Sequence, residues 1–118
     1  MNSRRKGCRG ECEWRDFLRE RGLVARRGQQ FAGGTDSPDV ICESLPGVHF
    51  EVKRVEAGNP YVWLEQAIRD SGTAKMPVVA HKRNNKDWIC VVKASDLIAL
   101  ILVAEKIRKI EEKTDDAG

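Results

Sequence analysis

Three side chains in the stretch SPDVICESLPGVHFEVKR, residues 37–54, have the types and spacing of a catalytic group. Glu51 and Lys53 are two residues apart in a run of strand-forming residues, so they point to the same face of a strand, together with His49. Asp39 begins the preceding strand-forming run. If the two strands pair through the turn SLPG, Asp39 lies across from the Glu51 region at the end of the sheet. We therefore expect two carboxylates and an ammonium group to meet there.

A third carboxylate, that of Glu11, can reach the same place from an earlier helix. Residues 8–21 have helical spacing, with an apolar stripe formed by Trp14, Phe17 and Leu18, and Glu11 lies near the edge of that stripe. Three carboxylates within a few ångströms repel one another unless a positive charge lies among them. Mg²⁺ takes oxygen ligands together with substrate phosphates, and a nearby lysine can stabilise developing charge. These residues are the parts of metal-assisted phosphodiester hydrolysis.

The triplet acid-x-lysine is weak evidence when taken alone. It is expected about once by chance in a chain of this composition, and it occurs twice, at Glu51 to Lys53 and at Glu111 to Lys113. The second copy lies on a charged helix end, where a structural role is sufficient. The first copy lies inside a strand, follows a Pro-Asp at a strand start, and has a glutamate on an earlier helix. This context distinguishes it.

The elements that must position these residues follow in the order helix, three strands, helix, two strands, helix. After the first helix we expect strands over 23–31, 39–43 and 48–55, a helix over 60–72, strands over 76–81 and 88–92, and a last helix over 95–113 capped by Ser95. The first three strands are expected to form an antiparallel meander, and 76–81 reads as a strand buried on both faces. The chain is therefore predicted to be one α/β domain over 1–118, with a basic flexible arm at 1–7 and a tail at 114–118.

The last predicted helix is apolar on every side over Leu97–Ala104. Such a segment is either central in the core or shared with a partner, and a chain of this size has little centre to spare. We favour a self-association surface over packing in the core. The eight residues are far fewer than the ~20 that a membrane span requires, so no membrane is expected as a partner.

Charge and cysteine usage point to a partner and to a compartment. The net charge is only +3, but the first nine residues carry four basic side chains and no acid, which suits phosphate contact or a solvated tail equally. The absence of a C2H2 pattern and of an aromatic ribbon favours recognition of the backbone and shape of a nucleic acid over its base sequence. The residues expected to follow a phosphate backbone are Arg4, Arg5, Lys6, Arg26, Arg27, Gln29, Gln30, Lys82 and Arg83.

Four cysteines without paired spacing, and no apolar signal segment, predict a reduced, cytoplasmic protein.

Pro38-Asp39 at a strand start and Glu51-Val52-Lys53 on the next strand resemble the PD-(D/E)xK nuclease superfamily. The segment RKGCRGE at residues 5–11 is similar to the helix start of archaeal Holliday junction resolvases, and RRGQQFAGGTDSPDV with HFEVKR and EQA is similar to small phage-encoded nucleases of the resolvase-like branch. The resemblance covers residues 5 to about 92. It implies a restriction-endonuclease-like core, which is a central mixed five-stranded sheet flanked by helices.

The resemblance also implies the roles of individual residues. Glu11, Asp39, Glu51 and the carbonyl of Val52 would bind one or two Mg²⁺ ions, which Mn²⁺ can replace, and Lys53 would position or activate the attacking water. Gln66 would contact the lysine, the water or the phosphate, and an ordinary surface amide is an equal interpretation of it. Glu13 could exchange roles with Glu11 if the helix start is shifted.

The expected function is that of a Mg²⁺-dependent endodeoxyribonuclease acting on branched DNA. A homodimer is expected, because paired cuts on opposing strands require two active sites related by a two-fold axis. The candidate interface is the helical segment Leu97–Ala104. One alternative is a nuclease of the same fold that acts on flaps, nicks or duplex ends, as in the virus-type replication-repair nuclease branch. The other is a non-catalytic DNA-binding or assembly protein.

Overall fold

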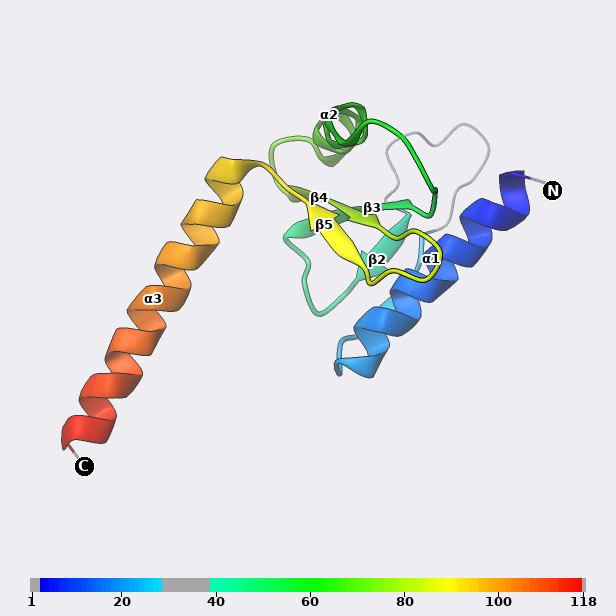
Figure 1. Cartoon of the computed structure of the whole chain (residues 1–118). Coiled ribbons are helices and arrows are strands. Elements are labelled where there is room, and N and C mark those ends of the chain that lie inside the picture. The colour runs from blue at the N-terminus through cyan, green and yellow to red at the C-terminus, as the bar shows by residue number, and fades with distance from the viewer. Residues whose placement is uncertain (1–2, 29–38, 118) are drawn as a thin grey trace.

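The computed structural model describes residues 3–28 and 39–117, with side chains described over 9–28 and 39–115. Its elements follow the predicted order (Figure 1). They are α1 (Ser3–Glu20), β1 (Ala25–Arg27), β2 (Val40–Cys42), β3 (Val48–Lys53), α2 (Pro60–Ser71), β4 (Met76–His81), β5 (Ile89–Val91) and α3 (Ala94–Ala117). The predicted phosphate contacts Gln29 and Gln30 lie outside the described residues.

The strands form a five-stranded mixed sheet in the order β1-β2-β3-β4-β5. β1, β2 and β3 pair antiparallel, which confirms the predicted meander, and β5 is antiparallel to β4. β3 and β4 are parallel, because α2 carries the chain back to the starting edge between them. The predicted α/β architecture with a mixed five-stranded sheet is thereby confirmed, and β3 lies at its centre.

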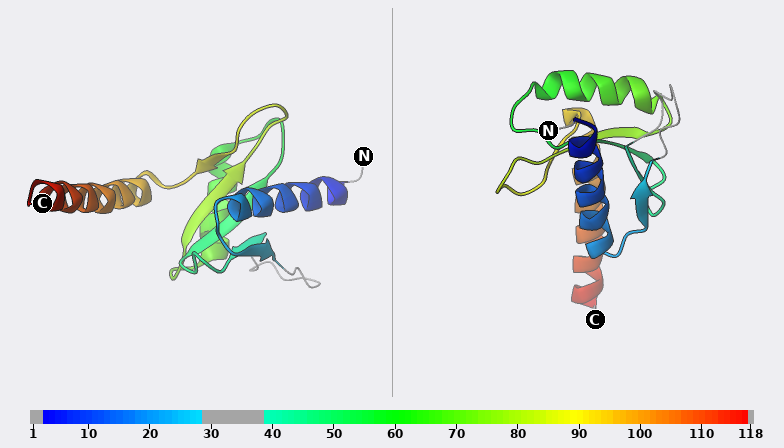
Figure 2. Two further views of the ribbon diagram at one scale, coloured as in Figure 1. Left: turned by 90° about the horizontal axis from the view of Figure 1, so that it is seen from below. Right: turned by 90° about the vertical axis from the view of Figure 1, so that its right-hand side faces the viewer.

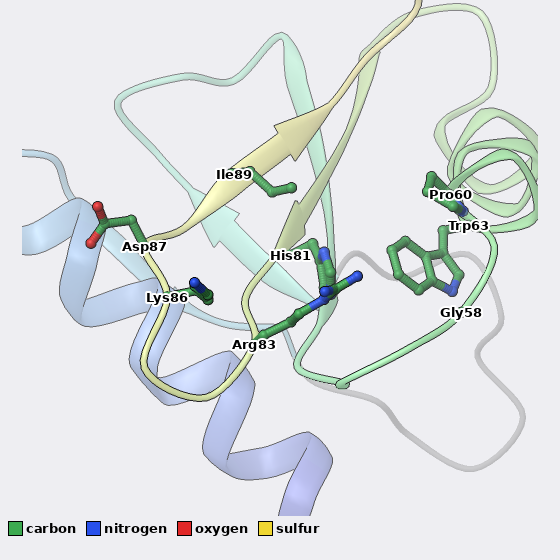
Figure 3. A pocket seen from close by; sticks show the side chains of 8 residues that line it. All are labelled: Gly58, Pro60, Trp63, His81, Arg83, Lys86, Asp87 and Ile89. Carbon is green, nitrogen blue, oxygen red and sulfur yellow. The ribbon is translucent and has the colours of Figure 1, made fainter.

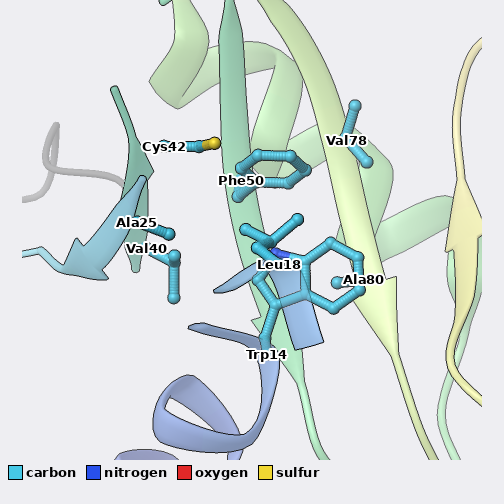
Figure 4. Packing of buried hydrophobic residues seen from close by; sticks show 8 residues of the cluster. All are labelled: Trp14, Leu18, Ala25, Val40, Cys42, Phe50, Val78 and Ala80. Atoms are coloured by element: carbon cyan, nitrogen blue, oxygen red, sulfur yellow. The ribbon is translucent and has the colours of Figure 1, made fainter. Parts of the chain in front are cut away.

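The two helices α1 and α2 cover opposite faces of this sheet (Figure 2). On the α1 face, Trp14 and Leu18 pack against a cluster that includes Val40 and Phe50 (Figure 4). On the α2 face, a smaller cluster contains Trp63, Ala67 and Val79. Because successive strand residues point to opposite faces, Phe50 enters the α1 core while its neighbours on β3 point toward α2.

The ends of α2 agree with the helix predicted over 60–72. The Asn59 side chain accepts a hydrogen bond from the amide of Tyr61 at 2.9 Å and caps the helix, and Pro60 occupies the first turn. Gly72 follows the last helical residue with φ of 65°, a conformation that glycine adopts without strain. These two signals fix the helix that faces β3.

The outer helices are longer than predicted. α1 begins at Ser3, so residues 3–7, expected to be a flexible arm, are helical, and α3 continues through Ala117 into the expected tail. No proline interrupts either segment, and ion pairs one turn apart support both helices, as between Arg9 and Glu13. α3 begins at Ala94, so Ser95 lies inside its first turn and is not the cap.

α3 projects away from the rest of the chain, which we call the body, residues 3–28 and 39–93 (Figure 1). Its large apolar side chains stay exposed: Leu102 is 58% exposed and Ile110 is 63% exposed. Packing of α3 in the core of its own chain, the alternative considered above, is therefore wrong. Among the described residues no helix is long and apolar enough to cross a membrane.

Gly10 marks the closest approach of α1 to the sheet. A Cβ atom placed on it would lie 2.5 Å from the Cβ of Arg54 and 3.5 Å from Cγ1 of Val52. The side chain of Arg54 at this point is held by its own backbone, so it cannot move aside by rotation alone. The absence of a side chain at residue 10 thus allows α1 to lie against the end of β3, next to Glu11.

We expect Gly10→Ala to lower the free energy of unfolding by about 1–3 kcal/mol, because the added methyl group overpacks the contact between α1 and Arg54. Urea denaturation measures the change. Gly47→Ala is the matched control, since a Cβ there meets no atom within 4 Å. Equal stability of the two variants would contradict this account of the helix contact.

Candidate active site

Asp39 and Glu51 meet at the start of β2. Asp39 directly precedes β2, its amide donates to the Phe50 carbonyl at 3.0 Å, and its Oδ2 accepts a hydrogen bond from the Val52 amide at 2.8 Å. A further hydrogen bond joins the carboxyl groups of Asp39 and Glu51. The aspartate side chain thus continues the pairing of β2 with β3 after the ladder ends, and the two carboxyl groups predicted to meet are in contact.

The peptide groups of Val52 point toward Asp39. Alternate residues of a strand direct their N–H and C=O groups to opposite edges. Phe50 bonds to Asp39 on the β2 side, whereas the Lys53 carbonyl accepts from the Lys82 amide on the β4 side. The Val52 carbonyl, predicted as a metal ligand, therefore shares the edge at which Asp39 lies.

Glu11 approaches the same aspartate from α1. Its Oε2 accepts hydrogen bonds from Nε and NH2 of Arg27 at 3.0 and 2.8 Å. Burial raises the pKa of Glu11, the charge of Asp39 raises it further, and the bond to Arg27 opposes both effects. Arg27, predicted to follow the DNA backbone, thus supplies positive charge among the carboxylates.

Glu13 lies against a different part of the molecule. It pairs with Arg9 at 3.1 Å and with Arg54 at 3.2 Å, and Arg54 also donates to Oδ1 of Asn84 at 2.9 Å. This network ties α1 to the connection between β4 and β5. Of the two glutamates left open by the sequence, Glu11 is the one whose charge meets Asp39.

Glu11→Gln is expected to reduce any metal-dependent activity of this site strongly, whereas Glu13→Gln is expected to leave the activity within about threefold of wild type. The reason is that the charge of Asp39 acts on Glu11, whereas Glu13 pairs with Arg9 and Arg54. Initial rates at saturating Mg²⁺ provide the measurement. Equal residual activity in the two variants would defeat the assignment.

Glu51 is buried and lies beside a buried histidine. Its Oε1 is 2.8 Å from Nε2 of His49, and the two side chains are only 6% and 2% exposed. Burial raises the pKa of Glu51 to about 7, and Asp39 contributes to the increase while the bond with His49 opposes it. Buried carboxyl groups with raised pKa values are frequent at cation-binding and proton-transfer sites, so Glu51 is a candidate for such a role.

His49, Glu51 and Asp70 form a group that sequence reasoning did not predict. Their ligand atoms all lie within 4.8 Å of one another, and among the described residues no other group of three meets this criterion. The predicted trio of Glu11, Asp39 and Glu51 is therefore more open than this one, and Glu51 belongs to both. One sequence signal could have indicated Asp70. It lies one helical turn after Gln66, a predicted site residue, so the two share one face of α2.

Lys53 and Gln66 approach each other as predicted. The Nζ of Lys53 lies 3.5 Å from Oε1 of Gln66, across the gap between β3 and α2. Lys53 is also aligned with His81 of the neighbouring strand. Gln66 is half-buried at this contact, and its contribution to the site stays a prediction.

The chain matches no protein-family model, no curated protein and no solved structure. Its chemistry is therefore inferred from the geometry of the site. Four carboxyl groups lie near one another in succession: Glu11 is near Asp39, Asp39 is near Glu51, and Glu51 is near Asp70. Lys53 lies on β3, the strand that carries Glu51. Hard oxygen donors in this number suit Mg²⁺ or Mn²⁺.

The remaining predicted DNA contacts lie on three separate segments, which are β1, the connection after β4 and the first turns of α1. Arg26 is exposed and pairs with Glu43 at 3.2 Å, and Lys82 and Arg83 lie on the connection after β4. Arg4, Arg5 and Lys6 fall in the first turns of α1, where side chains are not described. Their role in binding DNA stays a prediction.

A pocket of about 320 Å³ lies beside this connection (Figure 3). Arg83 and Lys86 line it together with Trp63 and His81. His81 donates from Nε2 to the Val55 carbonyl at 2.9 Å and packs against Trp63, with ring centres 4.6 Å apart. These contacts give His81 a structural role in joining β4 to the segment after β3.

Proposed function

We propose that the protein is a Mg²⁺-dependent endodeoxyribonuclease that hydrolyses phosphodiesters of branched DNA, on a restriction-endonuclease-like core. The observation that carries the proposal is the contact between the carboxyl groups of Asp39 and Glu51 on adjacent strands, with Lys53 two residues along from Glu51. The order of elements, with a meander followed by a parallel crossover through α2, supports the same fold.

The donors fit a hard divalent cation. Glu11, Asp39 and Glu51 supply carboxylate oxygens, and Val52 supplies a main-chain carbonyl on the same edge of β3. When bound, Mg²⁺ would neutralise the scissile phosphate and lower the pKa of the attacking water. Burial is the main cause of the raised pKa values of Glu11 and Glu51, and the nearby charge of Asp39 raises both further. A bound cation would offset both effects, because it favours the ionised form of each carboxyl group.

The chain's own residues position the reacting groups. Asp39 is held by the Val52 amide and cannot turn away from Glu51. His49 holds Oε1 of Glu51 from the buried side and leaves its second carboxylate oxygen to the site. Gln66 restrains the ammonium group of Lys53, which can orient the attacking water or stabilise the charge that develops on the phosphate.

The decisive experiment is cleavage of a synthetic four-way junction beside matched duplex, flap and single-stranded DNA. The wild type is compared with Asp39→Asn, with Mg²⁺ and with a chelator. We expect Mg²⁺-dependent nicking of the junction by the wild type and none by the variant. Asp16→Asn is the control, because Asp16 is an exposed acid of α1 that pairs with Arg15.

Each other outcome has a defined meaning. Cleavage that survives in Asp39→Asn would reject the proposed site. Preferential cleavage of flaps, nicks or ends would assign the same chemistry to another DNA structure. Binding of the junction without cleavage of any substrate would favour a non-catalytic DNA-binding protein.

A further inference from the structure

α3 presents a continuous apolar stripe outside the body of the protein. Leu100, Val103, Ile107 and Ile110 recur at spacings of three and four, and each is more than half exposed. Residues at such spacings lie on one side of a helix, in the pattern of the a and d positions of a coiled coil. This stripe, which we call the seam, extends beyond the segment Leu97–Ala104 that the sequence had indicated.

The opposite side of α3 is charged in its second half. Arg108 pairs with Glu105 and with Glu112, so these three side chains satisfy one another along a single helix. Since they lie away from the seam, they mark the solvent side of the helix. Over the second half of α3, a partner helix can therefore pack only against the side that carries the seam.

The direction of pairing follows from the uneven distribution of apolar residues along the helix. The first half of α3 is apolar on every side, whereas charged residues predominate after Ala104. A parallel partner places apolar half against apolar half. A fully overlapping antiparallel partner would place Leu97–Ala104 against the charged half, which would remove charged groups from water without compensation.

The charges beside the seam favour the same direction. With Leu100 and Ile107 at a positions, Lys106 occupies a g position and Glu111 the following e position. In a parallel pair the g residue of one helix faces the e residue of the next heptad in its partner. Lys106 of each chain would therefore face Glu111 of the other, with opposite charges at both contacts.

We propose that α3 pairs in parallel and in register with α3 of a second copy of this chain, through the seam of Leu100, Val103, Ile107 and Ile110. The two bodies then lie at the same end of the helix pair, where they flank the remaining apolar residues Leu97, Ile98, Ile101 and Leu102. This inference rests on α3 alone and does not depend on the proposed nuclease function, because its tests measure association rather than cleavage.

Charge reversal tests the register. Lys106→Glu and Glu111→Lys each place like charges at both contacts, and each is expected to weaken self-association by about tenfold or more in analytical ultracentrifugation. An equimolar mixture of the two variants restores opposite charges, so native mass spectrometry should show mixed pairs well above the statistical fraction. A wild type that remains monomeric at tens of micromolar, or a statistical mixture, would overturn the proposal.

Cross-linking tests the direction. In the proposed pair, Ile110 of one chain lies next to Ile110 of the other, so Ile110→Cys should form an interchain disulfide rapidly on mild oxidation. Lys109→Cys, on the outer side of the helix, is the matched control, and the wild type corrects for the native cysteines. An antiparallel pair that overlaps only over Leu97–Ala104 would keep the two residues at position 110 roughly 28 Å apart, and slow cross-linking would therefore reject the parallel arrangement.

Discussion

Glu51→Gln is expected to stabilise the metal-free protein at pH 8 by about 2–3 kcal/mol and to lower the rate of DNA cleavage by a factor on the order of 10³ or more. Burial raises the pKa of Glu51 from 4.5 to about 7. At pH 8 the folded chain must therefore hold an ionised carboxylate that is less stable there than in the unfolded chain. The neutral amide removes this penalty and also removes the charge that a cation requires.

The direction of the pH dependence follows from the same shift. Below pH 4.5 the folded and unfolded chains both protonate Glu51, so the residue adds no pH dependence. As the pH rises from 4.5 to about 7, the unfolded chain releases the proton first, and the free energy of unfolding falls. Above about pH 7 the penalty is constant. Urea denaturation of wild type and variant at pH 4.5 and pH 8, with chelator present, measures the difference.

Mg²⁺ supplies the second readout of this prediction. Cation binding keeps Glu51 ionised, so Mg²⁺ should stabilise the wild type more at pH 8 than at pH 5.5 and should have little effect on Glu51→Gln. Glu43→Gln is the matched control, because Glu43 is exposed and pairs with Arg26 at the edge of the sheet. If Glu51→Gln is less stable than the wild type at pH 8, the ionised carboxylate stabilises the folded protein, and the prediction is wrong.

Lys53→Met should slow cleavage by about 10²–10³-fold while changing the affinity for a four-way junction little. Methionine has a side chain of similar length and is compatible with strand β3. It removes the ammonium group, which lies 3.5 Å from Oε1 of Gln66. Single-turnover rates and a binding titration in Ca²⁺ separate the chemical step from association.

The matched control for this change is Lys75→Met, since Lys75 is exposed between α2 and β4. The control should keep full activity and the same urea midpoint. If Lys53→Met loses junction binding and cleavage in equal measure, Lys53 contacts the DNA backbone and does not act at the reacting phosphate.

The central part of the fold could be predicted from the sequence because its signals are local. Pro60 and Gly72 delimit α2, and alternation along 48–53 separates Phe50 from Glu51. The contact of Asp39 with Glu51 then follows from a short turn between adjacent strands. The outer limits of α1 and α3 could not be predicted. Gly7 favours a helix boundary, yet α1 continues through it, and residues 114–117 contain no proline or glycine to mark where α3 ends.

The parts of the site that were missed depend on tertiary contacts. Asp70 approaches His49 only because α2 crosses β3 at one particular height, and no short-range pattern encodes that height. Arg27 was predicted to follow the DNA backbone, and its ion pair with Glu11, which depends on the position of the short strand β1, was not predicted. For α3, the apolar run indicated burial, and nothing in it could show whether the covering surface belongs to the same chain.

The central position of β3 determines when the carboxylate cluster can exist during synthesis of the chain. β2 and β3 form a local hairpin, but Glu51 is buried only after α2 has crossed over and β4 has paired in parallel with β3. Contacts between segments this far apart form after the local ones, because long loops must close first. In a chain that has been made only as far as β3, Glu51 is therefore exposed to water, and the burial that raises its pKa is absent. The buried carboxylate cluster forms only once the chain has been made through His81, the last residue of β4.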